Sequence, residues 1–78
     1  MDLQSKLTKR ACEIVRSLCS EREGWEYGGR LSFGNAMTVF SVTRPDNNKD
    51  QMKVKVMWKF GEIIIERNGH EVKREEYG

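Results

Sequence analysis

The sequence predicts an α+β fold in which one N-terminal helix packs on a five-stranded antiparallel β-meander. Two observations lead to this prediction. Apolar residues recur with a helical period before Gly24 and alternate with polar residues after it. Turn dipeptides that contain glycine then separate the alternating runs at short intervals, as consecutive hairpins require. With 78 residues the chain has room for one domain, residues 1–78.

The first expected element is an amphipathic helix over residues 3–19. Its apolar residues fall within about one third of a helical wheel, and they are Leu3, Leu7, Ala11, Ile14, Val15 and Leu18. Asp2 or Ser5 can supply the N-cap, and Gly24 can adopt the left-handed conformation that stops a helix. The opposite face is basic and carries Lys6, Lys9, Arg10 and Arg16.

The alternating half of the chain divides into five predicted strands. They span residues 25–33, 36–44, 51–60, 62–67 and 70–76. Two-residue turns are expected at Gly34-Asn35, at Phe60-Gly61 and at Asn68-Gly69. Residues 44–50 are expected to form a polar loop that contains the only proline, and the adjacent glycines 28 and 29 predict either a bulge or a strong bend in the first strand.

The turn at Phe60-Gly61 decides whether the lysines of residues 52–59 bind phosphate or only face water. The expected cross-strand pairs are Trp58–Ile63 and Val56–Ile65 on one face, and Lys59–Glu62, Met57–Ile64 and Lys55–Glu66 on the other. Opposite charges across a strand pair stabilise the sheet by roughly 0.2–1 kcal/mol each. Lysines with built-in acidic partners indicate a solvated sheet face rather than a phosphate-binding track.

The turn at Gly34-Asn35 assigns the two faces of the sheet. A two-residue turn pairs Phe33 with Ala36 and Leu31 with Thr38, which places these side chains on the face of Phe40 and Val42. That face should pack under the helix, and Trp25, Tyr27 and Trp58 share its parity. The other face then presents an apolar cluster of Met37, Val39, Met57 and Ile64. Either a partner uses this cluster, or the helix or a chain end covers it.

The most plausible role from sequence is that of a small non-enzymatic protein that binds another protein, as an inhibitor, adaptor or regulator. The candidate partner surface is the open sheet face, with residues Met37, Val39, Lys53, Lys55, Met57, Lys59 and Ile64. An exposed edge strand, residues 25–33 or 70–75, offers a second route by adding to the sheet of a partner. Homodimerisation through the open face is a variant of the same hypothesis.

The alternative function is nucleic-acid binding through the basic helix face of Lys6, Lys9, Arg10 and Arg16. The overall charge gives this reading little support, because 14 basic residues are offset by 12 acidic ones and the formal net charge is only +2.

Catalytic, metal and cofactor sites are not expected. The one histidine, His70, follows a turn glycine, and Cys12 and Cys19 lie seven residues apart on the predicted helix. This spacing puts the cysteines about 10 Å apart, too far for a disulfide. Free thiols and the lack of an apolar leader predict an intracellular protein of the cytosol or nucleus, with no membrane partner.

Overall fold

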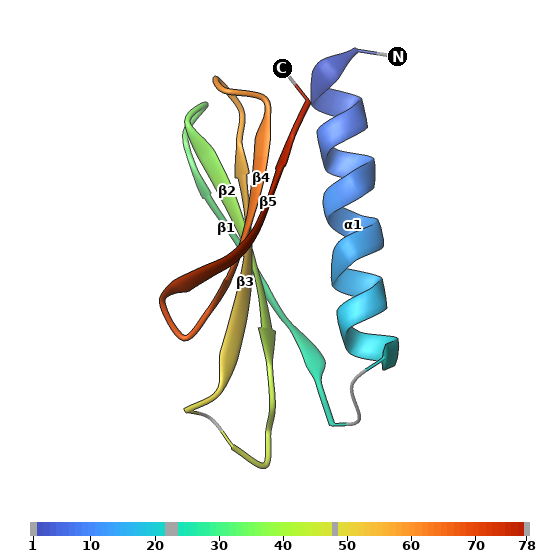
Figure 1. Ribbon diagram of the computed structural model, residues 1–78, viewed down its shortest axis with the longest axis vertical. Coiled ribbons are helices and arrows are strands. Elements are labelled where there is room, and N and C mark those ends of the chain that lie inside the picture. The colour runs from blue at the N-terminus through green and yellow to red at the C-terminus, as the bar shows by residue number, and fades with distance from the viewer. Residues whose placement is uncertain (1, 22–23, 48, 78) are drawn as a thin grey trace.

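The computed structural model describes residues 2–21, 24–47 and 49–77. The elements in chain order are α1 (Leu3–Glu21), β1 (Glu26–Phe33), β2 (Met37–Thr43), β3 (Gln51–Met57), β4 (Glu62–Arg67) and β5 (His70–Glu76). The strands form one antiparallel sheet in the order β1-β2-β3-β4-β5, and α1 lies along one of its faces (Figure 1). The predicted α+β fold is confirmed.

Helix α1 begins where the sequence supplies a cap. The side-chain oxygen Oδ1 of Asp2 accepts a hydrogen bond of 2.7 Å from the backbone N–H of Ser5. This bond satisfies one of the backbone donors that the first helical turn leaves unpaired. Asp2 is therefore the N-cap, and the helix runs two residues beyond the predicted end at Cys19.

The core lies between α1 and the central strands. The helix contributes one stripe of buried side chains, and β2, β3 and β4 contribute every second residue, as the two periods require. The buried members are Leu7, Ala11, Ile14, Val15, Trp25, Phe40, Val42, Met52, Val54, Val56, Ile63 and Ile65. The expected placement of Phe40 and Val42 under the helix is confirmed.

The predicted register of β1 against β2 is wrong by one residue from Gly29 to Phe33, whereas Glu26 and Tyr27 keep the partners that it implies, Thr43 and Val42. Phe33 pairs with Met37 and Leu31 with Val39, so the connection holds three residues rather than two. The extra residue is Ala36, whose N–H donates to the carbonyl of Phe33 while its carbonyl accepts from the N–H of Trp58. A slip of one residue moves side chains to the opposite face. Leu31 and Phe33 consequently point away from the helix and are 64% and 53% exposed.

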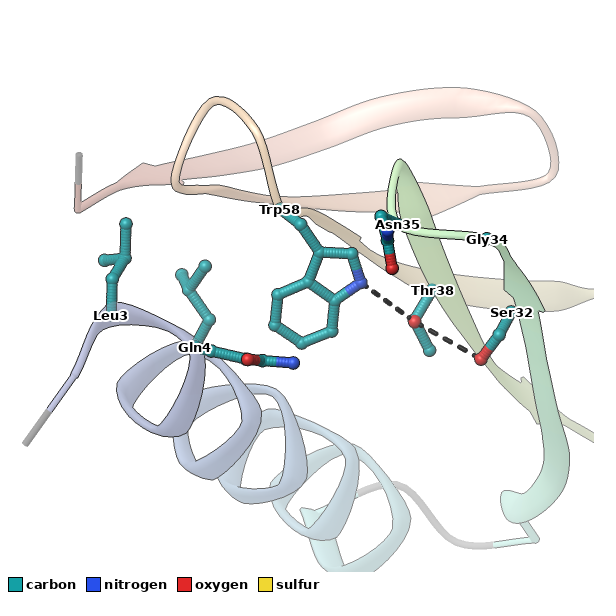
Figure 2. A pocket seen from close by; sticks show the side chains of 8 residues that line it. Leu3, Gln4, Ser32, Gly34, Asn35, Thr38 and Trp58 are labelled. Carbon is teal, nitrogen blue, oxygen red and sulfur yellow. Dashed lines mark hydrogen bonds between the residues drawn. The ribbon is translucent and has the colours of Figure 1, made fainter.

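The predicted register of β3 against β4 is wrong by two residues, which leaves the faces unchanged. The observed pairs include Val56–Ile63, Val54–Ile65, Lys55–Ile64 and Met57–Glu62. Residues 58–61 form the connection, in which the N–H of Gly61 donates to the carbonyl of Met57. Trp58 leaves the ladder because its backbone N–H donates to the carbonyl of Ala36 and its indole Nε1 donates to the hydroxyl of Thr38 (Figure 2). It remains half-buried against the core, as expected.

The turn at Asn68-Gly69 and the glycine bulge are confirmed. Asn68 and Gly69 have φ angles of 53° and 86°, the positive values of a two-residue hairpin turn. The β1–β2 register shifts between Tyr27 and Gly29, which places a bulge at Gly28. Tyr27 beside this bulge is 53% exposed, so its predicted place in the core is wrong. The two edge strands, β1 and β5, are those expected.

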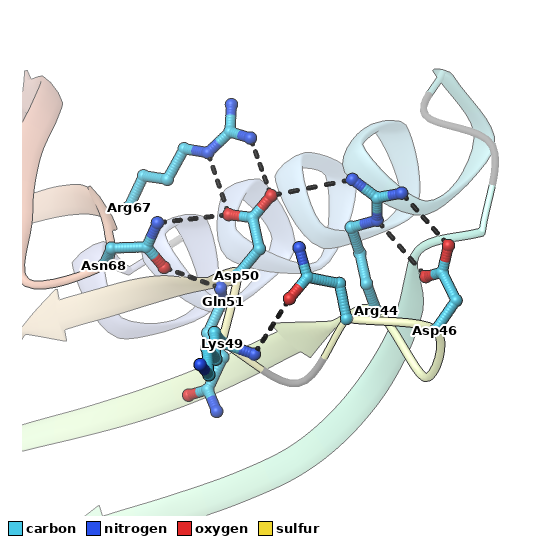
Figure 3. A network of polar contacts seen from close by, with 8 residues as sticks. Arg44, Asp46, Lys49, Asp50, Gln51, Arg67 and Asn68 are labelled. Carbon is cyan, nitrogen blue, oxygen red and sulfur yellow. Dashed lines mark hydrogen bonds and ion pairs between the residues drawn. The ribbon is translucent and has the colours of Figure 1, made fainter.

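A polar network ties the β2–β3 loop to the β4–β5 turn (Figure 3). The buried carboxylate of Asp50 accepts two hydrogen bonds from Arg67, at 3.1 and 2.8 Å, and a third from Asn68. These hydrogen bonds, led by those from Arg67, lower the pKa of Asp50. The guanidinium groups of Arg44 and Arg67 lie 5.8 and 5.7 Å from the ring of Trp25. The network therefore holds the β2–β3 loop against Trp25, a residue of the core.

Candidate functional site: the open sheet face

On the face of the sheet turned away from α1, three rows of residues cross all five strands. Among the described residues no further helix or strand covers it (Figure 1). The rows are Phe33–Met37–Met57–Glu62–Glu76, Leu31–Val39–Lys55–Ile64–Arg74 and Gly29–Ser41–Lys53–Glu66–Glu71. Apolar residues gather at the β1–β2 side and charged residues at the β4–β5 side.

The apolar side chains of this face form what we call the apolar patch, which consists of Leu31, Phe33, Met37, Val39, Met57 and Ile64. Val39 is 6% exposed although it lies outside the core cluster under the helix, so its neighbours on the open face cover it. Met37, Met57 and Ile64 are half-buried. Leu31 and Phe33 remain more than half exposed, and they are the most accessible part of the patch.

The charged side chains of this face are largely paired with one another. Lys55 lies 3.0 Å from the carboxylate of Glu66, the partner expected from sequence, although the two residues are diagonal rather than directly opposite. Arg74 forms ion pairs of 3.0 and 2.8 Å with Glu62 and Glu71. These bonds raise the pKa of Arg74, with Glu71 the main cause, and the pairing neutralises most of the charge beside the patch.

Two lysines of the predicted surface lie apart from these ion pairs. Lys53 is on the open face and exposed. Lys59 lies in the β3–β4 connection rather than in a strand, so its predicted pairing with Glu62 is wrong: Glu62 pairs with Met57. The structure thus brings together the four apolar residues of the prediction with Lys53 and Lys55, and separates Lys59 from them.

Leu31 and Phe33 are the site residues that sequence reasoning missed. The stretch from Phe33 to Met37 can form a turn of two or of three residues around Gly34. Only the two-residue turn would place the side chains of Leu31 and Phe33 under the helix. The neighbouring bulge at Gly28 adds a further change of parity within β1. As a result, β1 is largely exposed both before and after this bulge.

Part of the basic helix face contacts β5 and the residue that follows it. The guanidinium of Arg10 donates two hydrogen bonds, of 2.8 and 2.9 Å, to the carboxylate of Glu75. These bonds, together with one from the hydroxyl of Tyr77, lower the pKa of Glu75 to about 2. The ammonium of Lys6 lies 5.5 Å from the ring of Tyr77. Arg10 and Lys6 therefore have partners near the C-terminus of the described chain, whereas Lys9 and Arg16 are exposed.

The residues considered for chemistry lie in separate places. Cys12 is exposed on α1, Cys19 is half-buried there, and both are free thiols. His70 is exposed at the start of β5. In the part of the chain that the structure describes, no three side chains of histidine, cysteine, aspartate or glutamate come together in a way that could hold a metal ion. Nor does any described helix combine the length and apolar character needed to cross a bilayer.

Comparison of the chain with protein-family models, with curated proteins and with solved structures finds no match in any of the three. The functional argument consequently rests on the chain's own residues.

Proposed function

We propose that the chain is a small protein-binding module that docks another protein on its open sheet face. The observation that carries the proposal is the apolar patch, in which Leu31 and Phe33 are 64% and 53% exposed beside four further apolar side chains. Monomeric proteins seldom leave a contiguous apolar surface of this kind uncovered unless it serves an interaction. The role would be that of an inhibitor, adaptor or regulator.

The charges around the apolar patch indicate what kind of partner surface would fit it. Lys55, Arg74 and their glutamate partners already neutralise one another, so the exposed Lys53 and Glu76 are the charges of these three rows that form no ion pair among the described residues. A matching surface is apolar at its centre and acidic opposite Lys53. Such binding depends weakly on salt, since burial of apolar area drives it.

Edge strand β1 extends the same surface. It carries Leu31 and Phe33 and has no strand beyond it among the described residues. A partner strand added to β1 would gain backbone hydrogen bonds and cover the patch at the same time. The bulge at Gly28 restricts this mode to the segment after Gly29, because the ladder is irregular there.

The test is the double variant Leu31→Asp/Phe33→Asp, with Val72→Asp as the matched control. Val72 is 57% exposed in β5, so it undergoes the same change of character outside the patch. Light scattering across a concentration series first asks whether the occupant is a second copy of the chain. If the chain dimerises, the double variant should be monomeric and Val72→Asp should not.

If the chain is monomeric at all concentrations, the occupant is a different protein, and the same pair of variants is compared in affinity capture. The captured protein should be lost from Leu31→Asp/Phe33→Asp and retained by Val72→Asp. A partner that binds the double variant as tightly as the original chain contradicts the proposal. These positions are preferable to the half-buried Met57 and Ile64, whose replacement by aspartate also threatens the fold.

The competing proposal is nucleic-acid binding through the helix, for which Lys9 and Arg16 remain exposed. It predicts binding of labelled DNA or RNA that weakens steeply between about 50 and 200 mM salt and is lost in Lys9→Glu/Arg16→Glu. Fluorescence anisotropy measures both effects. Absence of binding at the lower salt concentration excludes this function and leaves the protein-binding proposal unaffected.

A further inference from the structure

A cleft of about 410 Å³ lies between the C-terminal half of α1 and strand β1, on the helix side of the sheet. Val15 and Phe40, both core residues, form its floor. Figure 1 shows β1 starting beside the end of α1 and then diverging from it across the sheet. The open face lies on the other side, so this cleft is independent of the proposed protein-binding surface.

The cleft exists because of the register of β1. The slip that sends Leu31 and Phe33 to the open face leaves Arg30 and Ser32 on the helix side, opposite Phe40 and Thr38. These polar side chains cannot complete an apolar contact with α1. The bulge at Gly28 removes a further side chain from the same stretch. The helix therefore leaves a gap along this flank, whereas on its other flank Arg10 forms an ion pair with Glu75 of β5.

Two arginines on opposite walls give the cleft its charge. Arg16 projects from α1, four residues after Cys12 and three before Cys19, and Arg30 projects from β1. Neither guanidinium forms an ion pair within residues 2–21, 24–47 and 49–77, and no acidic side chain of those residues lines the cleft. Arg10 on the other flank, by contrast, forms an ion pair with Glu75. The cleft thus combines an apolar floor with uncompensated positive charge.

We propose that this cleft binds a small organic anion with an apolar body, such as an aromatic or short aliphatic carboxylate. The apolar body would rest on Val15 and Phe40 beside Tyr27. The carboxylate would accept hydrogen bonds from Arg16 and Arg30, whose planar guanidinium groups match its geometry. The volume falls within the range of about 300–1,000 Å³ that is typical of small-molecule sites. A neutral ligand of the same shape forgoes the two charged contacts.

The first test compares 2-naphthoate with its neutral isostere 2-naphthamide by amide chemical-shift perturbation. Naphthoate should saturate and shift residues 12–19 and 27–30, while naphthamide should bind at least about tenfold more weakly. Arg16→Gln and Arg30→Gln should each weaken naphthoate binding about three- to tenfold. Lys9→Gln is the matched control, because it removes the same charge from α1 one turn outside the cleft.

Three outcomes overturn the proposal. One is no saturation by naphthoate up to about 10 mM, beyond the range of a specific site. Another is equal binding of naphthamide. The third is a set of shifts confined to Leu31, Phe33 and their neighbours, which would place the probe on the apolar patch. None of these outcomes affects the test of the open face, since the variants used there lie on the other side of the sheet.

A second measurement uses the two thiols of the cleft as reporters. Cys12 and Cys19 are alkylated in parallel with iodoacetate, an anion, and with neutral iodoacetamide. The ratio of the two rates cancels changes in the thiols themselves and reports the local electrostatic field. We expect Arg16→Gln/Arg30→Gln to lower this ratio several-fold and naphthoate to protect both thiols. An unchanged ratio contradicts the proposed attraction of anions to the cleft.

Discussion

The two faces of the sheet are built from similar residues but differ in how far they are buried. Strand β4 shows this within three consecutive isoleucines. Ile63 and Ile65 are 0% and 7% exposed under α1, whereas Ile64 between them is half-buried on the open face. The difference lies in what covers each face, because the strand supplies the same side chain to both. An apolar face without a cover in the described chain is therefore the feature that sets this small domain apart from a closed two-layer fold.

The largest expected effect compares the two faces directly through Ile63→Ala and Ile64→Ala. Removal of the buried side chain of Ile63 leaves a cavity in the core and should lower the free energy of unfolding by about 2–5 kcal/mol. The same change at half-buried Ile64 should cost about 1 kcal/mol. Denaturant titration measures both values. If Ile63→Ala fails to fold, Ile63→Val should still cost about 1 kcal/mol. Equal losses at the two positions would mean that the open face is covered in solution.

An intermediate effect is expected at the ion pair between Arg10 of α1 and Glu75 of β5. Glu75→Gln removes the charge that receives two hydrogen bonds from Arg10, and should lower the free energy of unfolding by about 1 kcal/mol after allowance for solvent screening. Glu76→Gln, at the next position and exposed, is the matched control. Thermal unfolding distinguishes the two, and an equal loss in both variants would attribute the effect to net charge alone.

The pH dependence of the same pair follows from its pKa. Glu75 has a pKa of about 2 in the folded protein against an ordinary value of 4.5, so protonation favours the unfolded chain. The stabilisation by Glu75 is complete above about pH 5 and is lost as the pH falls towards 2. The stability difference between the original chain and Glu75→Gln should shrink over this interval. A difference that stays constant would show that the carboxylate does not carry the contact.

The smallest expected effect on stability is at Leu31, although the proposed function depends on it. Leu31→Thr exchanges an exposed side chain in a strand for one that also suits a strand, and should change the free energy of unfolding by no more than about 0.5 kcal/mol. Urea unfolding provides the measurement. A loss as large as that at Ile63 would show that Leu31 is part of a packed core, contrary to the observed register.

The elements themselves were predictable because each rests on local physics. Asp2 caps the helix, the apolar stripe sets its length, and Asn68-Gly69 takes the positive φ angles that few other dipeptides accept. The edge positions of β1 and β5 followed from a meander without crossovers. The apolar cluster of Met37, Met57 and their neighbours was also found, because a register error of two residues preserves the faces.

The amino-acid sequence alone determined the helix, the five strands and their order. Tertiary structure decided the register of β1, and with it the exposure of Leu31 and Phe33 and the cleft beside Arg30. The physical reason is that turns of two and three residues around Gly34 are both locally acceptable. The three-residue turn that forms is accompanied by a hydrogen bond from a distant segment, in which the carbonyl of Ala36 accepts from the N–H of Trp58. The observed register therefore occurs together with a contact between residues 22 positions apart, which local sequence preferences do not contain.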